Sequence, residues 1–186
     1  MVERWFTRNP LHYFLKKYLE HKGFSVHFLR FSLTNGNFAQ SARYLKGYID
    51  SKELKDVVLV GISSGGLTCY HYLTDCGGWD KTKLFIGVGT PFKGSILSFM
   101  LFGFEIKKEL DPHGTYIQSV LRKPVKNAQK IYSIMAVSDQ MVGHDNSYLP
   151  GSKKIVIDVV GHNLLHTIWV PTMKKIAELS ENSTDF

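Results

Sequence analysis

A serine, an aspartate and a histidine in this sequence each follow a run of apolar residues, and their types could support nucleophilic catalysis. Ser63 is the centre of the pentapeptide GISSG (61–65), which comes after the apolar run VVLV. In a G-x-S-x-G turn between a strand and a helix, the serine hydroxyl is exposed, and side chains at the glycine positions would crowd the turn. The same small residues could also form an ordinary strand-to-helix turn without chemistry. Ser63 is therefore a candidate nucleophile whose role depends on its partners.

A serine hydroxyl is a poor nucleophile at neutral pH and needs a general base, which is oriented in turn by a carboxylate. Asp139 follows the apolar segment KIYSIMAV, and His162 follows KIVIDVV. Serine, acid and histidine in this chain order, each after a strand, match one known arrangement of such a triad on a parallel sheet. The site of an open parallel sheet lies at the carboxyl ends of its strands. The sequence therefore predicts Ser63 as nucleophile, Asp139 as orienting acid and His162 as base.

Other residues compete for the same roles. Asp145 could replace Asp139, but it lies six residues further into the loop, and Asp111 follows no expected strand. His166 lies one helical turn after His162 and could act as the base, although packing or a surface position is commoner for such a residue. The i, i+4 spacing of these two histidines occurs in zinc helices, but the glutamate of an HExxH motif is missing. We therefore expect no metal site and no cofactor.

Composition limits the class of protein. The 186 residues are 44% hydrophobic and 21% charged, as in an ordinary globular chain, and they suffice for one domain but hardly for two. The formal net charge of +7 comes from scattered lysines, so we expect a solvated basic surface and no nucleic-acid partner. No apolar run reaches the roughly 18 to 20 residues of a membrane span, and the polar start is not a secretory signal. We expect a cytoplasmic location.

The two cysteines favour the same compartment. Cys69 and Cys76 would lie two turns, or about 10 Å, apart on a helix, which is too far for a disulfide. Free thiols are usual in a reducing compartment.

Apolar runs alternate with helical patterns along the whole chain. Near-continuous apolar runs suit strands that are covered on both faces, and we expect five of them: 24–31, 56–62, 83–89, 130–137 and 154–160. Apolar residues at helical spacing predict helices near 11–22, 38–49 and 171–179, and GLTCYHYL (66–73) has the length of a helix after the serine. Alternating strands and helices indicate a parallel sheet with helices on both faces. The predicted fold is a single α/β domain over 1–186, a three-layer α/β/α sandwich with a mainly parallel, doubly wound sheet.

The segment 94–125 is less regular than the rest. It opens with GSILSFMLFGFEIKKEL, between the third and fourth expected strands, where a compact fold normally has a short crossover. Its dense apolar residues either pack under a long loop or form a cap over an acyl-binding pocket. We leave both interpretations open.

Four motifs together resemble the α/β-hydrolase superfamily, of the lipase and esterase type, and the resemblance covers nearly the whole chain. VVLVGISSGGL resembles that family's nucleophile elbow, and IGVGTPFKGS (86–95) resembles the segment after its next strand. SDQMVG resembles the acid loop and GHNLLH the histidine loop. Phe92 stands where such proteins often have histidine, which we do not expect to affect catalysis.

This resemblance implies an acyl-enzyme mechanism. Ser63 would attack an ester carbonyl, His162 would take and return the proton, and Asp139 would hold the imidazolium. The backbone N–H of Ser64 would be one oxyanion donor. The expected function is a carboxylic-ester hydrolase acting on small-molecule or lipid esters, with peripheral contact to a lipid surface as one possibility.

The front of the chain departs from the family. The second oxyanion donor normally comes from a loop after an early central strand, which lies between the strands that match 24–31 and 56–62. The opening MVERWFTRNPLHYF resembles only the segment after that loop, so we expect this strand to be absent. The neighbouring strands could close up, another chain could fill the gap, or the polypeptide could begin upstream of Met1.

Two other functions remain open at this stage. The same triad could serve an acyltransferase or a thioesterase, in which an alcohol, a thiol or coenzyme A takes part instead of water. A non-catalytic binding protein could also be built on a hydrolase fold, and the expected loss of the oxyanion strand favours it.

Overall fold

The protein was analysed as a computed structural model that describes residues 1–5, 11–32, 37–95 and 106–185. The strands are β1 (Val2–Trp5), β2 (Leu29–Ser32), β3 (Val57–Ile62), β4 (Thr82–Val88), β5 (Ile131–Ser138) and β6 (Lys153–Val160). The helices are α1 (His12–His21), α2 (Phe38–Ser51), α3 (Gly65–Asp75), α4 (Ile106–Leu110), α5 (Thr115–Arg122), α6 (His162–His166) and α7 (Val170–Glu181).

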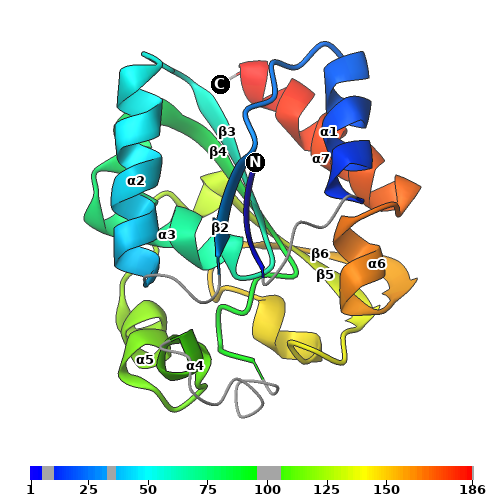
Figure 1. Cartoon of the computed structure of the whole chain (residues 1–186). Coiled ribbons are helices and arrows are strands. Elements are labelled where there is room, and N and C mark those ends of the chain that lie inside the picture. The colour runs from blue at the N-terminus through cyan, green and yellow to red at the C-terminus, as the bar shows by residue number, and fades with distance from the viewer. Residues whose placement is uncertain (6–10, 33–36, 96–105, 186) are drawn as a thin grey trace.

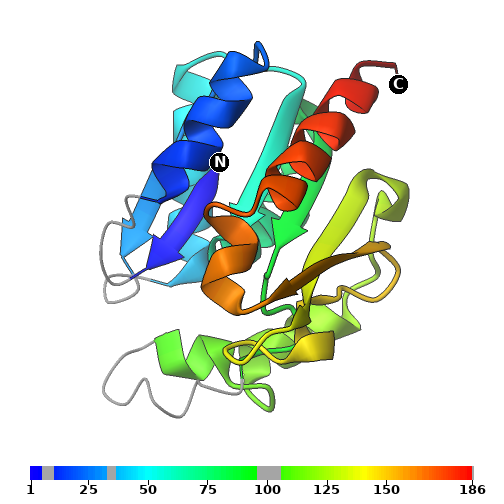
Figure 2. The same cartoon turned by 90° about the vertical axis from the view of Figure 1, so that its right-hand side faces the viewer.

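The strands form one sheet in the order β2-β1-β3-β4-β5-β6, and every neighbouring pair is parallel. Helices α2 and α3 cover one face of the sheet, and α1, α6 and α7 cover the other (Figures 1 and 2). This is the three-layer α/β/α arrangement that the alternation of strands and helices predicts, so the predicted fold class is confirmed.

Each face of the sheet carries its own apolar core. The α2/α3 side packs Phe38, Leu45 and Leu67 against the sheet. The α1/α7 side packs Leu15, Leu19 and Ile176 against it. Because the central strands are covered on both faces, their sequences are continuous apolar runs.

Sequence signals also set the ends of two helices. The side chain of Asn37 accepts a hydrogen bond from the backbone N–H of Gln40, whose own side chain bonds back to Asn37, forming a capping box at the start of α2. Pro171 occupies the first turn of α7, where its missing N–H costs nothing. In the part of the chain that the structure describes, no helix combines the length and apolar character of a membrane span.

The expectation that the chain lacks an early central strand was wrong. Residues Val2–Trp5 form β1, which lies between β2 and β3 and pairs with both: Val2 is opposite Leu29 on one side and opposite Gly61 on the other. VERW does not form an apolar run, so its pattern alone did not predict a strand. Its position between β2 and β3 gives its backbone groups hydrogen-bonding partners on both sides.

The strand predicted over 24–31 is shorter than expected. Only Leu29–Ser32 is strand, because β1 supplies its first partner, Val2, at Leu29. Residues 24–28 lead into β2 without strand pairing.

The cap predicted within 94–125 falls partly on residues 96–105, which lie outside the described part of the chain. The remainder forms α4 and α5, at the edge of the sheet to which the strand arrows point (Figure 2). Ile106, Leu110, Ile117 and Val120 are buried in the α2/α3-side core. The described part therefore packs as core, and a cap over a pocket stays a prediction.

Candidate active site

Ser63 occupies a strained turn between β3 and α3. Its φ is +51°, in the left-handed region that a non-glycine residue rarely adopts. The turn is fixed by two hydrogen bonds: the N–H of Ser63 donates to the carbonyl of Val88 (2.9 Å), and its carbonyl accepts from the N–H of Gly66 (3.0 Å). These bonds hold the side chain at the carboxyl end of β3.

Two glycines allow this turn to pack closely. A Cβ at Gly61 would lie 2.4 Å from Cα of Gly66, and a Cβ at Gly66 would lie 1.9 Å from Oγ1 of Thr90. Thr90 is fully buried. At Gly61 and Gly66 there is therefore room only for the hydrogen atoms of glycine. This lets β3 pack closely on the first turn of α3, and that turn on the segment after β4.

The imidazole of His162 lies directly beside the serine. His162 begins α6, just after β6, and Gly161 before it has φ +112°, which turns the chain toward Ser63. Nε2 of His162 is 2.8 Å from Oγ of Ser63. Ser63 is 8% exposed and His162 is 1% exposed, so both residues of this pair are buried.

Asp139, after β5, holds the other side of the imidazole. Its Oδ2 is 2.6 Å from Nδ1 of His162, while its Oδ1 accepts hydrogen bonds from the N–H groups of Met141 and Val142, both at 2.9 Å. Burial raises the pKa of Asp139, but the contact with His162 and the two N–H groups outweigh it, so the pKa lies below its ordinary value. The carboxylate is therefore ionised at neutral pH and accepts Nδ1–H, which leaves Nε2 to accept the hydroxyl proton of Ser63.

The segment after β4 completes the surroundings of the base. Gly89 has φ +57°, and a Cβ there would lie 3.1 Å from Cε1 of His162. Phe92 is fully buried and packs edge-to-face on Tyr70 and Phe85, with ring centroids 5.9 Å and 6.2 Å apart. The side chain of Phe92 thus belongs to the core.

His166, the alternative base, has different partners. Its Nδ1 is 2.8 Å from Nε2 of His12 on α1, and its ring packs against that of His162. Burial, followed by the charges of His162 and His12, holds the pKa of His166 well below its ordinary value. His166 is therefore neutral and lies behind the base.

The other competing residues lie apart from this cluster. The carboxylate of Asp145 is 3.5 Å from Nζ of Lys154 and largely exposed, and that of Asp111 accepts from the backbone N–H of His113. Ser64 is buried directly before α3. Among the described residues, no group of three or more potential metal ligands is arranged to hold an ion.

Sequence reasoning missed three supporting features. It did not identify Thr90 as the residue that fits against Gly66, and it did not pair His12 with His166. It also missed the N–H donors to Asp139, although an aspartate commonly accepts from backbone N–H groups two or three residues further along a turn. The first two contacts join distant segments, so no local signal predicts them.

The chain resembles solved structures in its architecture. No protein-family model matches the chain, and no curated protein matches it in sequence. Among solved structures, it is similar to the lipase BlEst2 of Bacillus licheniformis in mature form, with a TM-score of 0.71 at 13% identity over 95% of this chain and 91% of that one.

Two further structures are similar. MGS-MChE2, an α/β-hydrolase enzyme from a sediment metagenome of the Mar Chica lagoon in Morocco, gives a TM-score of 0.66 at 17% identity, over 100% of this chain and 92% of that one. The carboxylesterase CesB of Bacillus subtilis gives a TM-score of 0.56 at 11% identity, over 96% of this chain and 83% of that one. Together with the parallel sheet and its covering helices, these likenesses show that the protein has the α/β-hydrolase fold.

Proposed function

We propose that this protein is a serine hydrolase that cleaves carboxylic esters. The observation that carries the proposal is the buried hydrogen-bond chain from Oγ of Ser63 through the imidazole of His162 to the carboxylate of Asp139. Positive φ at Ser63 adds to it, because strained backbone is concentrated at functional sites. A lipase and a carboxylesterase among the similar structures support the same reaction class.

In the first half-reaction, Oγ of Ser63 attacks the ester carbonyl carbon as Nε2 of His162 takes the hydroxyl proton. The carbonyl π electrons move to oxygen and form a tetrahedral oxyanion. When the oxyanion collapses, the bond to the leaving alcohol breaks, and His162 returns the proton to the alcohol oxygen. The product is an acyl ester on Ser63.

In the second half-reaction, water attacks that acyl ester while His162 takes its proton. Collapse of the second oxyanion breaks the bond to Oγ of Ser63, which receives the proton back. A carboxylic acid is released. In both steps the imidazolium is stabilised by the carboxylate of Asp139, whose two backbone donors fix its direction.

We place one oxyanion donor at the backbone N–H of Ser64. Ser64 directly follows the nucleophile and precedes α3, whose amino-terminal end carries partial positive charge. One preorganised donor contributes about 3 kcal/mol to such a transition state. In the resembling family the second donor comes from a loop after an early central strand; residues 6–10, which follow β1 in the sequence, lie outside the described part of the chain.

The substrate class in this proposal is a small-molecule or lipid ester. Helices α4 and α5 lie at the carboxyl edge of the sheet, and Ser63 directly follows the carboxyl end of β3. The apolar segment 94–105 precedes these helices in the sequence. If this region caps an acyl pocket, hydrolysis should rise sharply once the substrate forms an interface. A flat response through the critical micelle concentration indicates a plain esterase.

The test is hydrolysis of p-nitrophenyl butyrate by wild type and by Ser63→Ala, with and without an added alcohol acceptor. The proposal expects steady release of butyric acid by wild type and loss of activity in Ser63→Ala. If butyryl groups pass mainly to the alcohol, the protein is an acyltransferase. If folded wild type releases no nitrophenol from this or longer esters, the proposal fails.

A further inference from the structure

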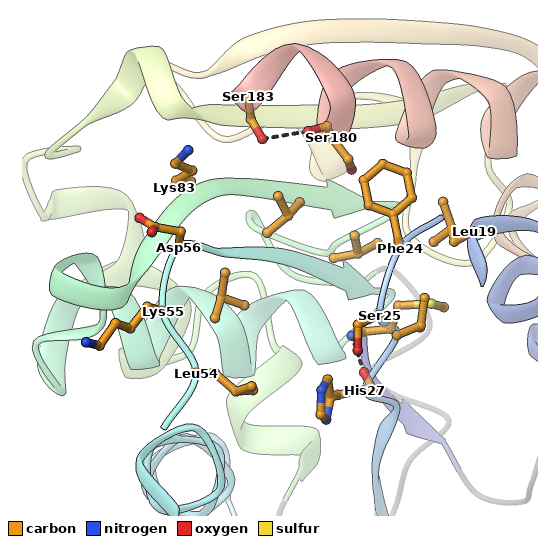
Figure 3. Close-up of a pocket in the computed structure, with 15 residues that line it drawn as sticks. Leu19, Phe24, Ser25, His27, Leu54, Lys55, Asp56, Lys83, Ser180 and Ser183 are labelled. Atoms are coloured by element: carbon orange, nitrogen blue, oxygen red, sulfur yellow. Dashed lines mark hydrogen bonds between the residues drawn. The ribbon is translucent and has the colours of Figure 1, made fainter. Parts of the chain in front are cut away.

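The candidate acid is held by loops at the carboxyl ends of the strands, away from the cavity shown in Figure 3. That cavity, of about 400 Å³, opens beside the first residues of β3, at the opposite end of this strand from Ser63 (Figure 3). Its described lining includes apolar side chains such as Leu19 and Phe24, and no residue of the triad. The surroundings of the triad are instead formed by the segments that follow β4 and β5.

The turn after β5 surrounds the carboxylate of Asp139. The N–H groups of Met141 and Val142 both donate to its Oδ1 at 2.9 Å, and the N–H of Gly143 donates to the carbonyl of Asp139 at 3.0 Å. Asp139 and Val142 are buried. Where water is largely excluded, such hydrogen bonds are electrostatically stronger than they are in water. The direction of the carboxylate therefore depends on how this turn is held.

Ser95, in the segment after β4, holds that turn from outside. Its Oγ donates to the carbonyl of Met141 at 2.6 Å. This carbonyl and the N–H of Val142 belong to one peptide unit, and because the unit is planar and trans, they point in opposite directions. The hydroxyl of Ser95 and the carboxylate of Asp139 therefore polarise the same peptide in the same sense, so that each hydrogen bond strengthens the other.

The result is a continuous hydrogen-bond chain that ends at the candidate nucleophile. It runs from Oγ of Ser95 through this peptide unit to Oδ1 of Asp139. From Oδ2 of Asp139 it continues to Nδ1 of His162 at 2.6 Å, and from Nε2 of His162 to Oγ of Ser63 at 2.8 Å. The hydroxyl of Ser95 thus lies at one end of the chain and that of Ser63 at the other.

The position of Ser95 is itself closely defined. Its N–H donates to the carbonyl of Leu110, the last residue of α4, at 2.9 Å, and Ser95 is 8% exposed. Gly94 has φ +89°, and a Cβ there would lie 2.7 Å from N and Cα of Pro112. Only glycine therefore fits directly before Ser95, and the pair that ends IGVGTPFKGS places the hydroxyl against the acid turn.

A second set of contacts joins the same two segments further along. The N–H of Lys93 donates to the carbonyl of Asn146 at 3.0 Å, and Nδ2 of Asn146 donates to the carbonyl of Val142 at 2.8 Å. The segment after β4 therefore binds the acid loop at two points. When the hydroxyl of Ser95 alone is removed, the loop should stay folded while the carboxylate loses part of its support.

We propose that Ser95 is a positioning residue of the candidate active site, whose hydroxyl fixes the acid turn and thereby the direction of the Asp139 carboxylate. Ser95 acts through Asp139 and not on the ester itself. Because this role is defined by the triad, it rests on the proposed function.

Removal of the hydroxyl should impair the chemical step more than substrate binding. In Ser95→Ala, kcat for p-nitrophenyl butyrate should fall about tenfold, which is the scale of one hydrogen bond, while KM stays within about twofold of the wild-type value. A variant that is folded and keeps the wild-type kcat contradicts the proposal.

A double-mutant cycle identifies the residue through which Ser95 acts. Asp139→Asn already lacks the carboxylate, so Ser95→Ala should reduce the residual kcat of that variant by less than about twofold. If Ser95→Ala costs the same tenfold in both backgrounds, Ser95 acts independently of Asp139, and the proposal is wrong.

Ser152→Ala is the matched control. Ser152 is also 8% exposed, and its Oγ donates to the carbonyl of Leu149 at 2.8 Å, outside the peptide units that face Asp139. Both variants lose a serine hydroxyl from a backbone carbonyl, so both should unfold at a somewhat lower temperature. Only Ser95→Ala should lose kcat. Equal loss of kcat in the two variants would mean that general loosening of the loops, and not the hydrogen-bond chain, causes the effect.

The proton between Asp139 and His162 gives a readout that needs no substrate. A short N–H···O⁻ hydrogen bond deshields its proton, so Nδ1–H of His162 should give a far-downfield NMR resonance, identified by its loss in Asp139→Asn. In Ser95→Ala this resonance should move upfield or be lost through faster exchange with water, whereas Ser152→Ala should leave it unchanged.

The two readouts separate the role of Ser95 from the reaction. An unchanged resonance in Ser95→Ala overturns the positioning role, whatever the activity of the protein. If the resonance responds as expected but folded wild type hydrolyses no ester, the positioning of Asp139 by Ser95 is supported and the proposed ester hydrolysis fails.

Discussion

The ring of His166 packs edge-on against that of His162, with centroids 4.8 Å apart and planes at 79°. On its other side, Nδ1 of His166 is 2.8 Å from Nε2 of His12. His166 thereby connects the helix that carries the candidate base to α1, on the same face of the sheet. In the described structure, its Nε2 is buried and has no hydrogen-bond partner, which is a further reason for this ring to stay neutral.

Protonation of His166 should limit stability in mild acid. Its pKa in the folded protein lies well below 6.5, the ordinary value it regains on unfolding. Below pH 6.5 the unfolded chain therefore binds a proton that the folded protein does not, and stability falls by up to about 1.4 kcal/mol per pH unit. Urea unfolding at pH 6.5 and pH 5 should show wild type losing about 1.5 kcal/mol more than His166→Gln.

The control for that experiment is His21→Gln, at the exposed end of α1. It should follow the wild-type pH dependence. If the free energy of unfolding depends on pH in the same way in wild type and His166→Gln, the pKa of His166 is the same in the folded and unfolded chain, and the prediction fails.

Asp139→Asn should leave the fold intact and reduce esterase kcat by about 10⁴-fold. An amide at this position presents an N–H₂ group or a weaker acceptor to Nδ1, so the imidazole loses the tautomer that accepts the serine proton. Steady-state kinetics on a p-nitrophenyl ester measures the loss. Asp145→Asn replaces the largely exposed carboxylate near Lys154. Because this residue lies outside the candidate triad, its kcat should stay within about twofold of the wild-type value. A larger loss in Asp145→Asn than in Asp139→Asn would reassign the acid.

Gly66→Ala should destabilise the protein and impair the site together. The added methyl group would overlap the buried hydroxyl of Thr90, and such overpacking costs about 1 to 3 kcal/mol. Because Gly66 also donates its N–H to the carbonyl of Ser63, displacement of the turn should lower kcat as well. Thermal unfolding and ester hydrolysis measure the two effects.

Gly47→Ala provides the matched comparison. Nothing lies within 4 Å of a Cβ at Gly47, inside α2, so alanine should stabilise this helix by up to about 1 kcal/mol and leave activity unchanged. If Gly66→Ala is equally harmless, the close packing of Gly66 on Thr90 does not constrain the turn.

The sequence predicted the parts of the fold that depend on local pattern. Apolar runs located β3, β4, β5 and β6 to within one residue at each end, because strands covered on both faces exclude polar residues. The spacing of Leu15 and Leu19, and the proline of α7, likewise located helices. These signals are carried within single segments.

Features that depend on partners far along the chain were not predictable in this way. β1 is strand because β2 and β3 flank it, and 24–28 is not strand because β1 does not extend beside it. At the site, the order of Ser63, Asp139 and His162 relative to the strands led to three residues that do lie together. The contacts of Thr90 and His12 depend on tertiary packing, for which the sequence carries no spacing rule.

If Ser63 is an activated nucleophile, a fluorophosphonate probe should label it covalently, and mass spectrometry of the intact protein and its peptides identifies the labelled residue. Ser64→Ala is the control, because it removes the neighbouring hydroxyl and keeps the backbone N–H. We expect one phosphonyl group on Ser63 in wild type and in Ser64→Ala, and none in Ser63→Ala. Folded wild type that remains unlabelled, or Ser63→Ala that is labelled as readily as wild type, would contradict this expectation.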